Sequence, residues 1–326
     1  MNIAVLGTGA WGTALARLLH QNQHAVTLWG HDAKHLADVQ AAGCNERYLP
    51  GIDLPAALRF EADLQMAIRD QEVVVVAVPS KAFRAVTKSL QEFRGLVVSV
   101  TKGIEYETDL TMGVVAQANA PLARVAALSG PSLAMEVARE VPTAVVAASR
   151  ELATAQQAQQ LFHRPAFRVY TSTDMLGVEL GGALKNVIAI AAGVGDGLGF
   201  GDNAKAALVT RGIVEMRRIG VACGAQAETF SGLSGLGDLT VTCFSRLSRN
   251  RGFGEQLGRG RSVSEILAIT VTVAEGYPTA LSAFQLAARL KVATPIINEV
   301  HAMLYSSKNV KEAVRDLTNR DSKAED

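Results

Sequence analysis

The sequence predicts an α/β domain followed by an all-α domain, and three observations lead to this prediction. Short apolar runs alternate with helical patterns through the first half of the chain. A glycine-rich segment, Gly7-Thr-Gly-Ala-Trp-Gly12, joins the first apolar run to the first helical pattern. After about Thr173 no strand pattern follows. We therefore expect a Rossmann-type, doubly wound and mostly parallel sheet over residues 1–172 and an all-helical domain over residues 173–326.

The predicted strands are largely unbroken apolar runs, which is typical of a parallel sheet covered by helices on both faces. They occupy residues 3–6, 25–29, 73–78, 96–100, 125–128, 144–147 and 167–170. In such folds ligands bind beyond the carboxyl ends of the strands. The segments 78–80, 101–103 and 129–132 are therefore the places where we expect functional residues.

The glycine-rich segment has the order of strand, turn and helix that a dinucleotide requires. Gly7 permits the tight turn, Gly9 leaves room for a pyrophosphate, and Gly12 lets the helix pack closely on the strand. The helix N-terminus offers N–H groups and the positive end of its dipole to phosphates. The sequence therefore predicts a binding site for NAD or NADP.

The end of the second predicted strand should read the 2′ position of the cofactor ribose. Asp32 could accept a hydrogen bond from a 2′-hydroxyl, or it could cap the next helix. Gly30 leaves room at this point, and His31 and Lys34 could face a 2′-phosphate. The pattern favours acceptance of NADP and leaves the preference between NADP and NAD open.

Apolar spacing in the second half predicts helices at residues 178–194, 203–220, 249–258, 276–290, 295–306 and 309–318. Between residues 193 and 201 glycine occupies every second position. We interpret this glycine segment as a sharp connection between two helices.

The composition argues against several classes of function. A net charge of +1 provides no basic surface for nucleic acid or for a membrane. No apolar run is expected to cross a bilayer, which takes about 20 residues. Met1 leads directly into the first strand, so we expect no signal peptide and a cytoplasmic protein. Cys44, Cys223 and Cys243 lack the spacing of a disulfide framework or a zinc site, and we expect no metal.

Lys185 is the leading candidate for a catalytic group. It is the only charged residue between Glu179 and Asp196, in a helix apolar enough to be buried. A buried, unpaired ammonium is costly, so Lys185 should face a polar cavity. There it could protonate the alkoxide that forms when a ketone is reduced. The alternative is a lysine on a solvated helix face, which its apolar neighbours make less favourable.

The other candidates each have a structural alternative. Lys102 follows a strand end and is either a site residue or an ordinary loop lysine. Gly130 and Ser132 either cradle a substrate with free N–H groups or form a turn and a helix cap. Asp238 lies between apolar segments and either pairs with a lysine or caps a helix.

A basic segment at residues 245–251 contains Arg246, Arg249 and Arg251. Arginine beside serine and asparagine suits bidentate recognition of a phosphate, although a basic run is most often a solvated surface. Glu275 could accept a hydrogen bond from a ribose or an amide, or it could cap a helix.

Together these segments resemble the glycerol-3-phosphate dehydrogenase family in its bacterial, NAD(P)-dependent form. The resemblance implies interconversion of dihydroxyacetone phosphate and sn-glycerol 3-phosphate, which supplies glycerophospholipid synthesis. The matching segments occur in family order over nearly the whole chain: residues 7–12, 101–103, 129–132, 181–186, 197–201, 232–238, 248–251 and 274–277.

The resemblance also implies roles for individual residues, with Lys185 as the proton donor and acceptor. Beside Lys185, it implies contacts to substrate for Lys102, Gly130, Ser132, Asn186, Asp238, Ser248, Arg249 and Asn250. Beside the three glycines of the turn, it implies contacts to cofactor for Ala10, Trp11, His31, Lys102, Ala134, Arg249, Val273 and Glu275. His31 stands where other members carry arginine, so it gives less support to NADP.

Two other functions remain open from the residues alone. A β-hydroxyacid dehydrogenase shares the two-domain organisation but needs a carboxylate-binding site in place of the cluster at residues 248–251. A non-catalytic NAD(P)-sensing module keeps the glycine segment but has no need for an apolar helix carrying Lys185. The apolar second domain could also support a homodimer, although no interface is indicated.

Overall fold

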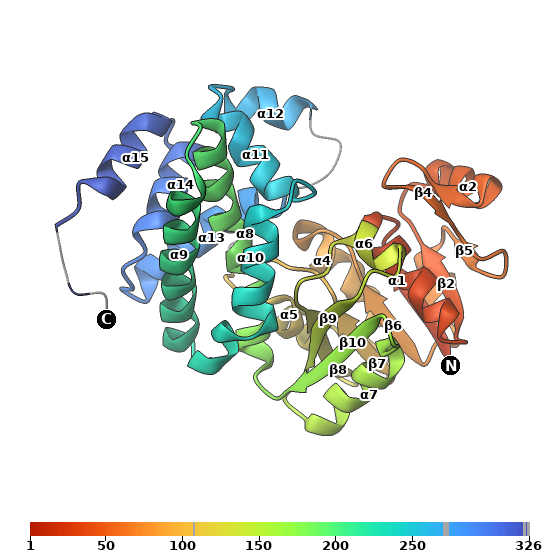
Figure 1. The fold of residues 1–326 in the computed structure, drawn as a ribbon. Coiled ribbons are helices and arrows are strands. Elements are labelled where there is room, and N and C mark those ends of the chain that lie inside the picture. Colours follow the sequence, from red (N-terminus) through yellow and green to blue (C-terminus); the bar gives the residue numbers. More distant parts are fainter. Residues whose placement is uncertain (107, 270–273, 322–323, 325–326) are drawn as a thin grey trace. The chain divides into compact units, whose positions relative to one another are not determined.

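The computed structural model describes residues 1–106, 108–269, 274–321 and 324. The chain forms two compact units, which Figure 1 shows as a sheet-containing part and a helical part. Unit 1 comprises Met1–Glu105 and Leu110–Glu179, and unit 2 comprises Tyr106–Asp109 and Leu180–Asp326. The change of unit therefore falls inside helix α8 (Met175–Gly197) rather than at residue 172.

Unit 1 contains an eight-stranded sheet within its described residues. Its strand order is β10-β9-β8-β7-β6-β1-β2-β5. All neighbours pair in parallel except β8 and β9, which are antiparallel. The bounds are β1 (Asn2–Leu6), β2 (Ala25–Trp29), β5 (Arg59–Glu61), β6 (Val73–Val76), β7 (Leu96–Ser99), β8 (Arg124–Ser129), β9 (Thr143–Ala148) and β10 (Phe167–Ser172). The mostly parallel, doubly wound sheet and its seven predicted strands are confirmed.

Helices cover both faces of this sheet, and this explains the unbroken apolar runs. Ile3 and Val5 pack on one face with Leu15 and Phe162, while Leu6 packs on the other face with residues such as Phe83 and Val115. The helices of unit 1 are α1 (Ala10–Gln21), α2 (Ala33–Ala42), α3 (Leu64–Ile68), α4 (Ser80–Thr87), η1 (Lys88–Leu90), α5 (Met112–Asn119), α6 (Ala134–Ala138) and α7 (Leu152–Phe162). The central strands, such as β1 and β6, therefore have apolar partners on both faces of the sheet.

A small antiparallel hairpin, β3 (Cys44–Asn45) and β4 (Leu49–Asp53), lies outside the main sheet. Its Leu49 and Ile52 side chains are buried in a cluster with Ala14 of α1 and Ala138 of α6. Sequence analysis missed this hairpin because Pro50 and Gly51 interrupt its short apolar pattern.

Unit 2 is helical throughout its described residues (Figure 1). Its helices after α8 are α9 (Asp202–Ala222), η2 (Ala227–Ser231), η3 (Leu233–Gly237), α10 (Asp238–Phe244), α11 (Arg249–Gly258), α12 (Val263–Ile269), α13 (Gly276–Arg289), α14 (Pro295–Tyr305) and α15 (Val310–Thr318). The six predicted helices are confirmed. The short elements η2, η3, α10 and α12 were not predicted, because one or two turns carry too little periodicity.

Helix α8 corrects the expectation that no apolar run is long enough to cross a membrane. By length and composition α8 passes that test, and it is the one helix among the described residues that does. However, 89% of its most apolar window is buried inside the protein. This burial is typical of the central helix of a globular domain.

Sequence analysis interpreted the glycine segment at residues 193–201 as a connection between two helices. That interpretation is wrong for the first part of the segment, which belongs to α8. Gly193 and Gly197 lie inside α8, where they allow α11 to approach backbone to backbone. A Cβ on Gly193 would lie 1.9 Å from the Arg251 carbonyl oxygen, and one on Gly254 would lie 1.9 Å from that of Ile190. Only the end of the segment forms the turn, where Gly199 has a φ of 81°. Close helix packing therefore explains two of the five glycines, Gly193 and Gly197.

Gly254→Ala should lower the free energy of unfolding by about 1–3 kcal/mol, because the new methyl group overlaps the backbone of α8. Gly252→Ala is the matched control in the same helix, since its added Cβ meets nothing within 4 Å. The control should be neutral or up to about 1 kcal/mol more stable, through helix propensity. Urea denaturation measures both variants, and equal effects would contradict the packing argument.

Candidate active site

The turn between β1 and α1 has a separate steric reason for each of its three glycines. Gly7 has a φ of 127°, and a Cβ there would lie 2.6 Å from the Ala77 carbonyl oxygen. A Cβ on Gly12 would lie 2.0 Å from the Gly7 carbonyl oxygen, whereas one on Gly9 would meet nothing within 4 Å. No side chain caps the N-terminus of α1. The turn thus presents uncapped N–H groups beside open space, which suits a phosphate.

Predicted cofactor residues that are far apart in sequence come together around this turn. Ala10 and Trp11 of α1 and Ala134 of α6 pack against one apolar cluster of unit 1. His31 is exposed after the end of β2. The structure therefore gathers three of these residues on neighbouring helices, and their contact with a cofactor stays a prediction.

Asp32 acts as a helix cap, which decides one alternative left open by the sequence. Its Oδ1 accepts a hydrogen bond from the His35 backbone N–H at 3.0 Å, at the start of α2. This hydrogen bond lowers the pKa of the Asp32 carboxyl group. The capping interpretation of Asp32 is therefore confirmed, and it uses one of the two carboxylate oxygens.

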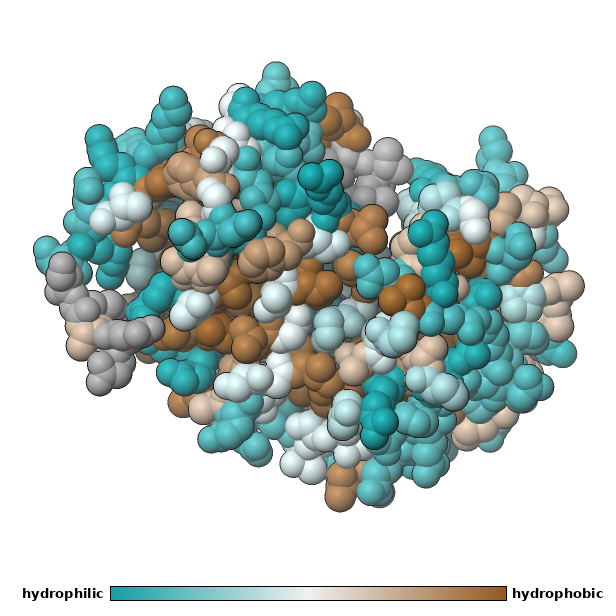
Figure 2. Space-filling model, viewed as in Figure 1, coloured by the Kyte–Doolittle hydropathy of each residue, from teal (hydrophilic) through white to brown (hydrophobic). Residues whose placement is uncertain are grey.

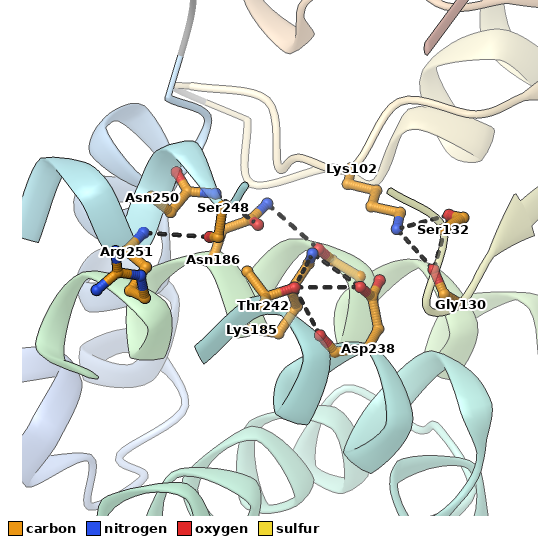
Figure 3. Close-up of polar contacts among 11 residues, drawn as sticks. Lys102, Gly130, Ser132, Lys185, Asn186, Asp238, Thr242, Ser248, Asn250 and Arg251 are labelled. Carbon is orange, nitrogen blue, oxygen red and sulfur yellow. Dashed lines mark hydrogen bonds and ion pairs between the residues drawn. The ribbon is translucent and has the colours of Figure 1, made fainter. Parts of the chain in front are cut away.

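Lys102, Gly130 and Ser132 also converge within unit 1, as Figure 3 shows. Lys102 Nζ donates to the Gly130 carbonyl at 2.9 Å and lies 3.5 Å from Ser132 Oγ. Ser132 Oγ donates to the same carbonyl at 2.9 Å. Gly130 has a φ of 134°, and a Cβ would lie 2.9 Å from Val145 Cα. Ser132 is not the helix cap, because α6 starts at Ala134 without a side-chain cap.

Lys185 is buried in unit 2 and forms an ion pair with Asp238 (Figure 3). Nζ lies 2.9 Å from Asp238 Oδ1, and the two side chains are only 8% and 2% exposed. Nζ also donates to Thr242 Oγ1 at 2.7 Å, while that hydroxyl donates to the Asp238 carbonyl at 2.6 Å. The ammonium is therefore held at a fixed point by two partners on α10. Both the pairing of Asp238 with a lysine and the burial of the apolar helix agree with the sequence analysis.

The π-helical turn η3 fixes the start of α10 against α8. A Cβ on Gly181 of α8 would lie 2.6 Å from the Ser234 carbonyl oxygen, so the two backbones are in close contact. Gly235 is equally restricted, with the Phe230 carbonyl oxygen 2.1 Å from an added Cβ. Single π turns are common at functional sites. Here the turn delivers Asp238 to Lys185.

Asn186, beside Lys185, belongs to an amide network that joins three helices. Asn250 Nδ2 of α11 donates to Asn186 Oδ1 at 2.8 Å. Asn250 Oδ1 accepts from the Gly276 backbone N–H of α13 at 2.9 Å. A Cβ on Gly276 would lie 2.6 Å from the Asn186 carbonyl oxygen, so only glycine fits. The network fixes the N-terminus of α11 relative to Lys185.

The N-terminus of α11 carries the predicted phosphate residues. Ser248 is the N-cap and accepts from the Arg251 backbone N–H at 3.2 Å. Arg249 is exposed, and within the described residues its side chain makes no hydrogen bond or salt bridge. Loss of surrounding water lowers its pKa, and the Glu275 carboxylate opposes this shift. Arg249 therefore offers a cation beside free helix N–H groups.

Arg251 does not join this cation, although the sequence placed it in the same basic cluster. Its guanidinium forms salt bridges with Asp196 of α8 and Glu255 of α11 and donates to the Ser245 carbonyl. Arg251 is thus used to fasten α11 to α8. Arg246 precedes the Ser248 cap, whereas Arg249 is the first residue of α11, so Arg249 is the arginine that lies at the helix N-terminus.

Two further predictions concern the start of α13. Glu275 lies at the N-cap position but makes no side-chain cap there, so capping does not explain it. Val273 lies outside the described residues.

No group of His, Cys, Asp and Glu residues suited to a metal occurs in the part of the chain that the structure describes.

Two other buried carboxylates have perturbed pKa values, which often mark functional sites. Burial raises the pKa of Glu179 and of Glu215 to about 7, and hydrogen bonds to each carboxylate oppose this. Glu179 accepts from Thr111 Oγ1 and the Gly113 N–H at the start of α5. Glu215 accepts from the Ile296 and Ile297 N–H groups at the start of α14. Both therefore act as helix caps.

Sequence profiles of one family match both parts of the chain. "NAD-dependent glycerol-3-phosphate dehydrogenase N-terminus" matches residues 2–155, and the corresponding C-terminus matches residues 174–315. The chain belongs to the NAD-dependent glycerol-3-phosphate dehydrogenase family. The resemblance drawn from the sequence is thereby confirmed.

Individual glycerol-3-phosphate dehydrogenases match over their full length. The chain is 48% identical to glycerol-3-phosphate dehydrogenase (NAD(P)+) of Syntrophotalea carbinolica, covering 100% of this chain and 99% of that protein. It is 49% identical to the protein of the same name from a Geobacter species, covering 99% and 98%. The crystal structure of glycerol-3-phosphate dehydrogenase from Coxiella burnetii has a TM-score of 0.94 at 38% identity, covering 98% and 99%.

Sequence analysis missed Thr242, which holds the Lys185 ammonium. One signal could have found it, because Thr242 follows Asp238 by four residues and so shares its face of a helix. It was overlooked because α10 itself was not predicted. Asn45, whose contacts are described below, had no comparable signal.

The Lys185–Asp238 pair should show strong coupling in stability. Lys185→Met or Asp238→Asn alone leaves one buried charge unpaired and should lower the free energy of unfolding by about 3–5 kcal/mol. The double variant removes both charges and should recover most of that loss. Urea denaturation of the four proteins gives the coupling energy. Additive losses would show that the two groups do not stabilise each other.

Proposed function

We propose that this protein catalyses the reversible reduction of dihydroxyacetone phosphate to sn-glycerol 3-phosphate with NADPH or NADH. The observation that carries the proposal is the buried Lys185–Asp238 pair in a chain of the glycerol-3-phosphate dehydrogenase family. Within this proposal residues 1–172 bind most of the dinucleotide, and residues 173–326 supply the proton-transfer group and most of the groups for substrate.

The nicotinamide cofactor supplies the hydride when it is bound. The turn at Gly7, Gly9 and Gly12 fits its pyrophosphate, because Gly9 leaves open space and the first turn of α1 has no side-chain cap. Further contacts are proposed for Ala10, Trp11, His31, Lys102, Ala134, Arg249, Val273 and Glu275. Asp32 caps α2 through Oδ1 only, so the preference between NADP and NAD stays open in this proposal.

The phosphate of the substrate is assigned to the N-terminus of α11. Arg249 supplies a guanidinium there. The first backbone N–H groups of α11 lie at the positive end of the helix dipole, where they can donate to a phosphate. Ser248 and Asn250 shape this end of the helix through the cap and the amide network. A phosphate monoester suits this arrangement better than a simple carboxylate, because it has more acceptor oxygens and more charge.

Lys185 is assigned the proton transfer. During reduction a hydride adds to C2 of the ketone, and Lys185 Nζ donates a proton to the oxygen that becomes the alcohol. Asp238 and Thr242 hold Nζ in place while it loses and regains a proton from solvent. In the reverse direction the neutral amine accepts the hydroxyl proton. Lys102, with Gly130 and Ser132, is assigned to orient the substrate and to add positive charge near the developing alkoxide.

The proposal also includes the cellular location and the oligomeric state of the protein. A product that serves glycerophospholipid synthesis, made from small soluble phosphates, is consistent with a cytoplasmic enzyme. We retain a homodimer as a prediction from the apolar character of the second half of the chain.

The first experiment measures absorbance of the reduced nicotinamide with purified protein and dihydroxyacetone phosphate, using NADPH and NADH in parallel. We expect oxidation that depends on the phosphorylated ketone, and the two rates give the cofactor preference. If the protein binds NADPH but does not oxidise it when dihydroxyacetone phosphate is added, the substrate assignment fails. Turnover with a β-keto acid would then favour the hydroxyacid dehydrogenase, and binding without turnover would favour the sensor.

Lys185→Ala should lower kcat by about 10²–10⁴-fold, because the proton donor is lost, while the affinity for NADPH remains close to that of the wild type. Steady-state kinetics with a fluorescence titration of NADPH measures both. Asp238→Asn in the same background restores charge balance and should recover stability without recovering kcat. Near-normal turnover of either protein would remove Lys185 from its role.

Arg249→Ala should raise KM for dihydroxyacetone phosphate by about tenfold or more, since a charge-assisted contact to phosphate is lost. Arg246→Ala is the matched control, because it removes the same charge from an exposed position in the same segment. Initial-rate kinetics at fixed ionic strength compares the two variants. An unchanged KM in Arg249→Ala, or equal changes in both, would contradict the phosphate role.

A further inference from the structure

We propose that Asn45, in the hairpin β3–β4, is a positioning residue for the phosphate-binding turn at residues 7–12. The inference rests on the proposed function only in that the turn is taken to bind NADPH or NADH. Asn45 lies outside every motif that the sequence analysis used. Its role follows from its contacts with the turn.

A single amide nitrogen of Asn45 contacts both sides of the turn. Asn45 Nδ2 donates to the Thr8 carbonyl oxygen at 2.9 Å and to Thr13 Oγ1 at 2.8 Å. Thr8 lies between Gly7 and Gly9, and Thr13 follows Gly12 in α1. Because a carbonyl oxygen only accepts hydrogen bonds, the nitrogen of the amide must face the turn. Asn45 thus holds the distance between the turn and the first residues of the helix.

The side chain of Asn45 is buried and, within the described part of the chain, carries an unsatisfied acceptor beside its two hydrogen bonds. Asn45 is 0% exposed, and its Oδ1 has no hydrogen-bond partner among the described residues. An unsatisfied buried acceptor is unfavourable, and a leucine of similar size would avoid it. A side chain that stabilised only the core would not need an amide here. The polar contacts with the turn give the amide a reason to be present.

Thr8 is also restricted from its other side. A Cβ on Gly30, just after β2, would lie 2.7 Å from Thr8 Oγ1. The Gly7 N–H donates to the Trp29 carbonyl at 2.9 Å. The turn is therefore held between the end of β2 and the hairpin. Removal of Asn45 frees one of these two sides.

The hairpin is itself anchored, so it can act as a fixed support. Leu49 and Ile52 are buried against Ala14 and Ala138. The Leu54 N–H donates to the carbonyl of Gly43, where α2 ends in a left-handed conformation. A cofactor pyrophosphate is bound by backbone N–H groups whose position must be accurate to about 0.5 Å and whose direction must be accurate to about 10–20°. Since no side chain caps α1, Asn45 is well placed to fix that direction.

The test compares Asn45→Leu with Asn119→Leu in the complete protein. Asn119 is the matched control, because its Nδ2 donates to the Arg84 carbonyl at 3.0 Å and to Thr87 Oγ1 at 2.8 Å, both in α4 and neither in the turn. Asn45→Leu should raise the Kd of NADPH by about tenfold in a fluorescence titration, since two hydrogen bonds are lost. At saturating NADPH, its kcat and its KM for dihydroxyacetone phosphate should stay within about twofold of the wild type.

Asn119→Leu should keep the Kd of NADPH within about twofold of the wild-type value, even if its thermal stability falls as much as that of Asn45→Leu. An unchanged Kd in folded Asn45→Leu, or equal changes in both variants, would overturn the inference. If Asn45→Leu does not fold, Thr13→Val removes one of the two contacts and should raise Kd by about threefold. An unchanged Kd in Thr13→Val then overturns the inference.

The titration separates this inference from the proposed function. Binding of NADPH is measured without turnover, so a protein that binds NADPH but does not reduce dihydroxyacetone phosphate fails the proposed function only. Failure of the wild type to bind either reduced cofactor overturns the inference together with the cofactor site.

Discussion

The buried ion pair between Lys185 and Asp238 is the constraint on which the organisation of the helical unit depends. Two opposite charges away from water are tolerated only with good geometry and further hydrogen bonds. Thr242 supplies one of these bonds, and the π turn before Asp238 brings the carboxylate close to α8. The rest of α8 is apolar because the helix is largely buried inside the protein. The ammonium of Lys185 is thereby held at one defined point of this apolar helix.

Close backbone packing places the remaining groups around that point. Glycines on α8 and α11 let the two helices approach so closely that carbonyl oxygens would collide with any Cβ. Arg251, with Asp196 and Glu255, fastens the same pair of helices electrostatically. As a result the N-terminus of α11, with Arg249, is linked to Asn186 through Asn250. Rigid elements therefore position the candidate phosphate site, which is the arrangement that accurate binding requires.

The sheet unit solves its binding problem mainly with backbone groups. Its glycine turn presents N–H groups and open space, and the shape of that turn depends on contacts from β2 and from the hairpin at Asn45. Side chains complete the unit where Lys102 and Ser132 meet at the Gly130 carbonyl. The two units thus use different physical means. The sheet unit offers uncapped backbone N–H groups at its glycine turn, and the helical unit holds a buried amine.

The sequence by itself determined seven strands of the main sheet, the long helices, the glycine turn and the burial of the helix that carries Lys185. Each of these is written in a local pattern: an unbroken apolar run, a helical period, or one charge in an apolar helix. Only the tertiary structure decided which partners these residues have. In the folded protein Asp32 caps a helix, and Arg251 forms salt bridges. Gly193 and Gly197 allow close helix packing, and Thr242 accepts a hydrogen bond from Lys185. The reason is that periodicity reports the face a residue occupies, whereas a hydrogen bond or a close backbone contact depends on which distant segment reaches that face.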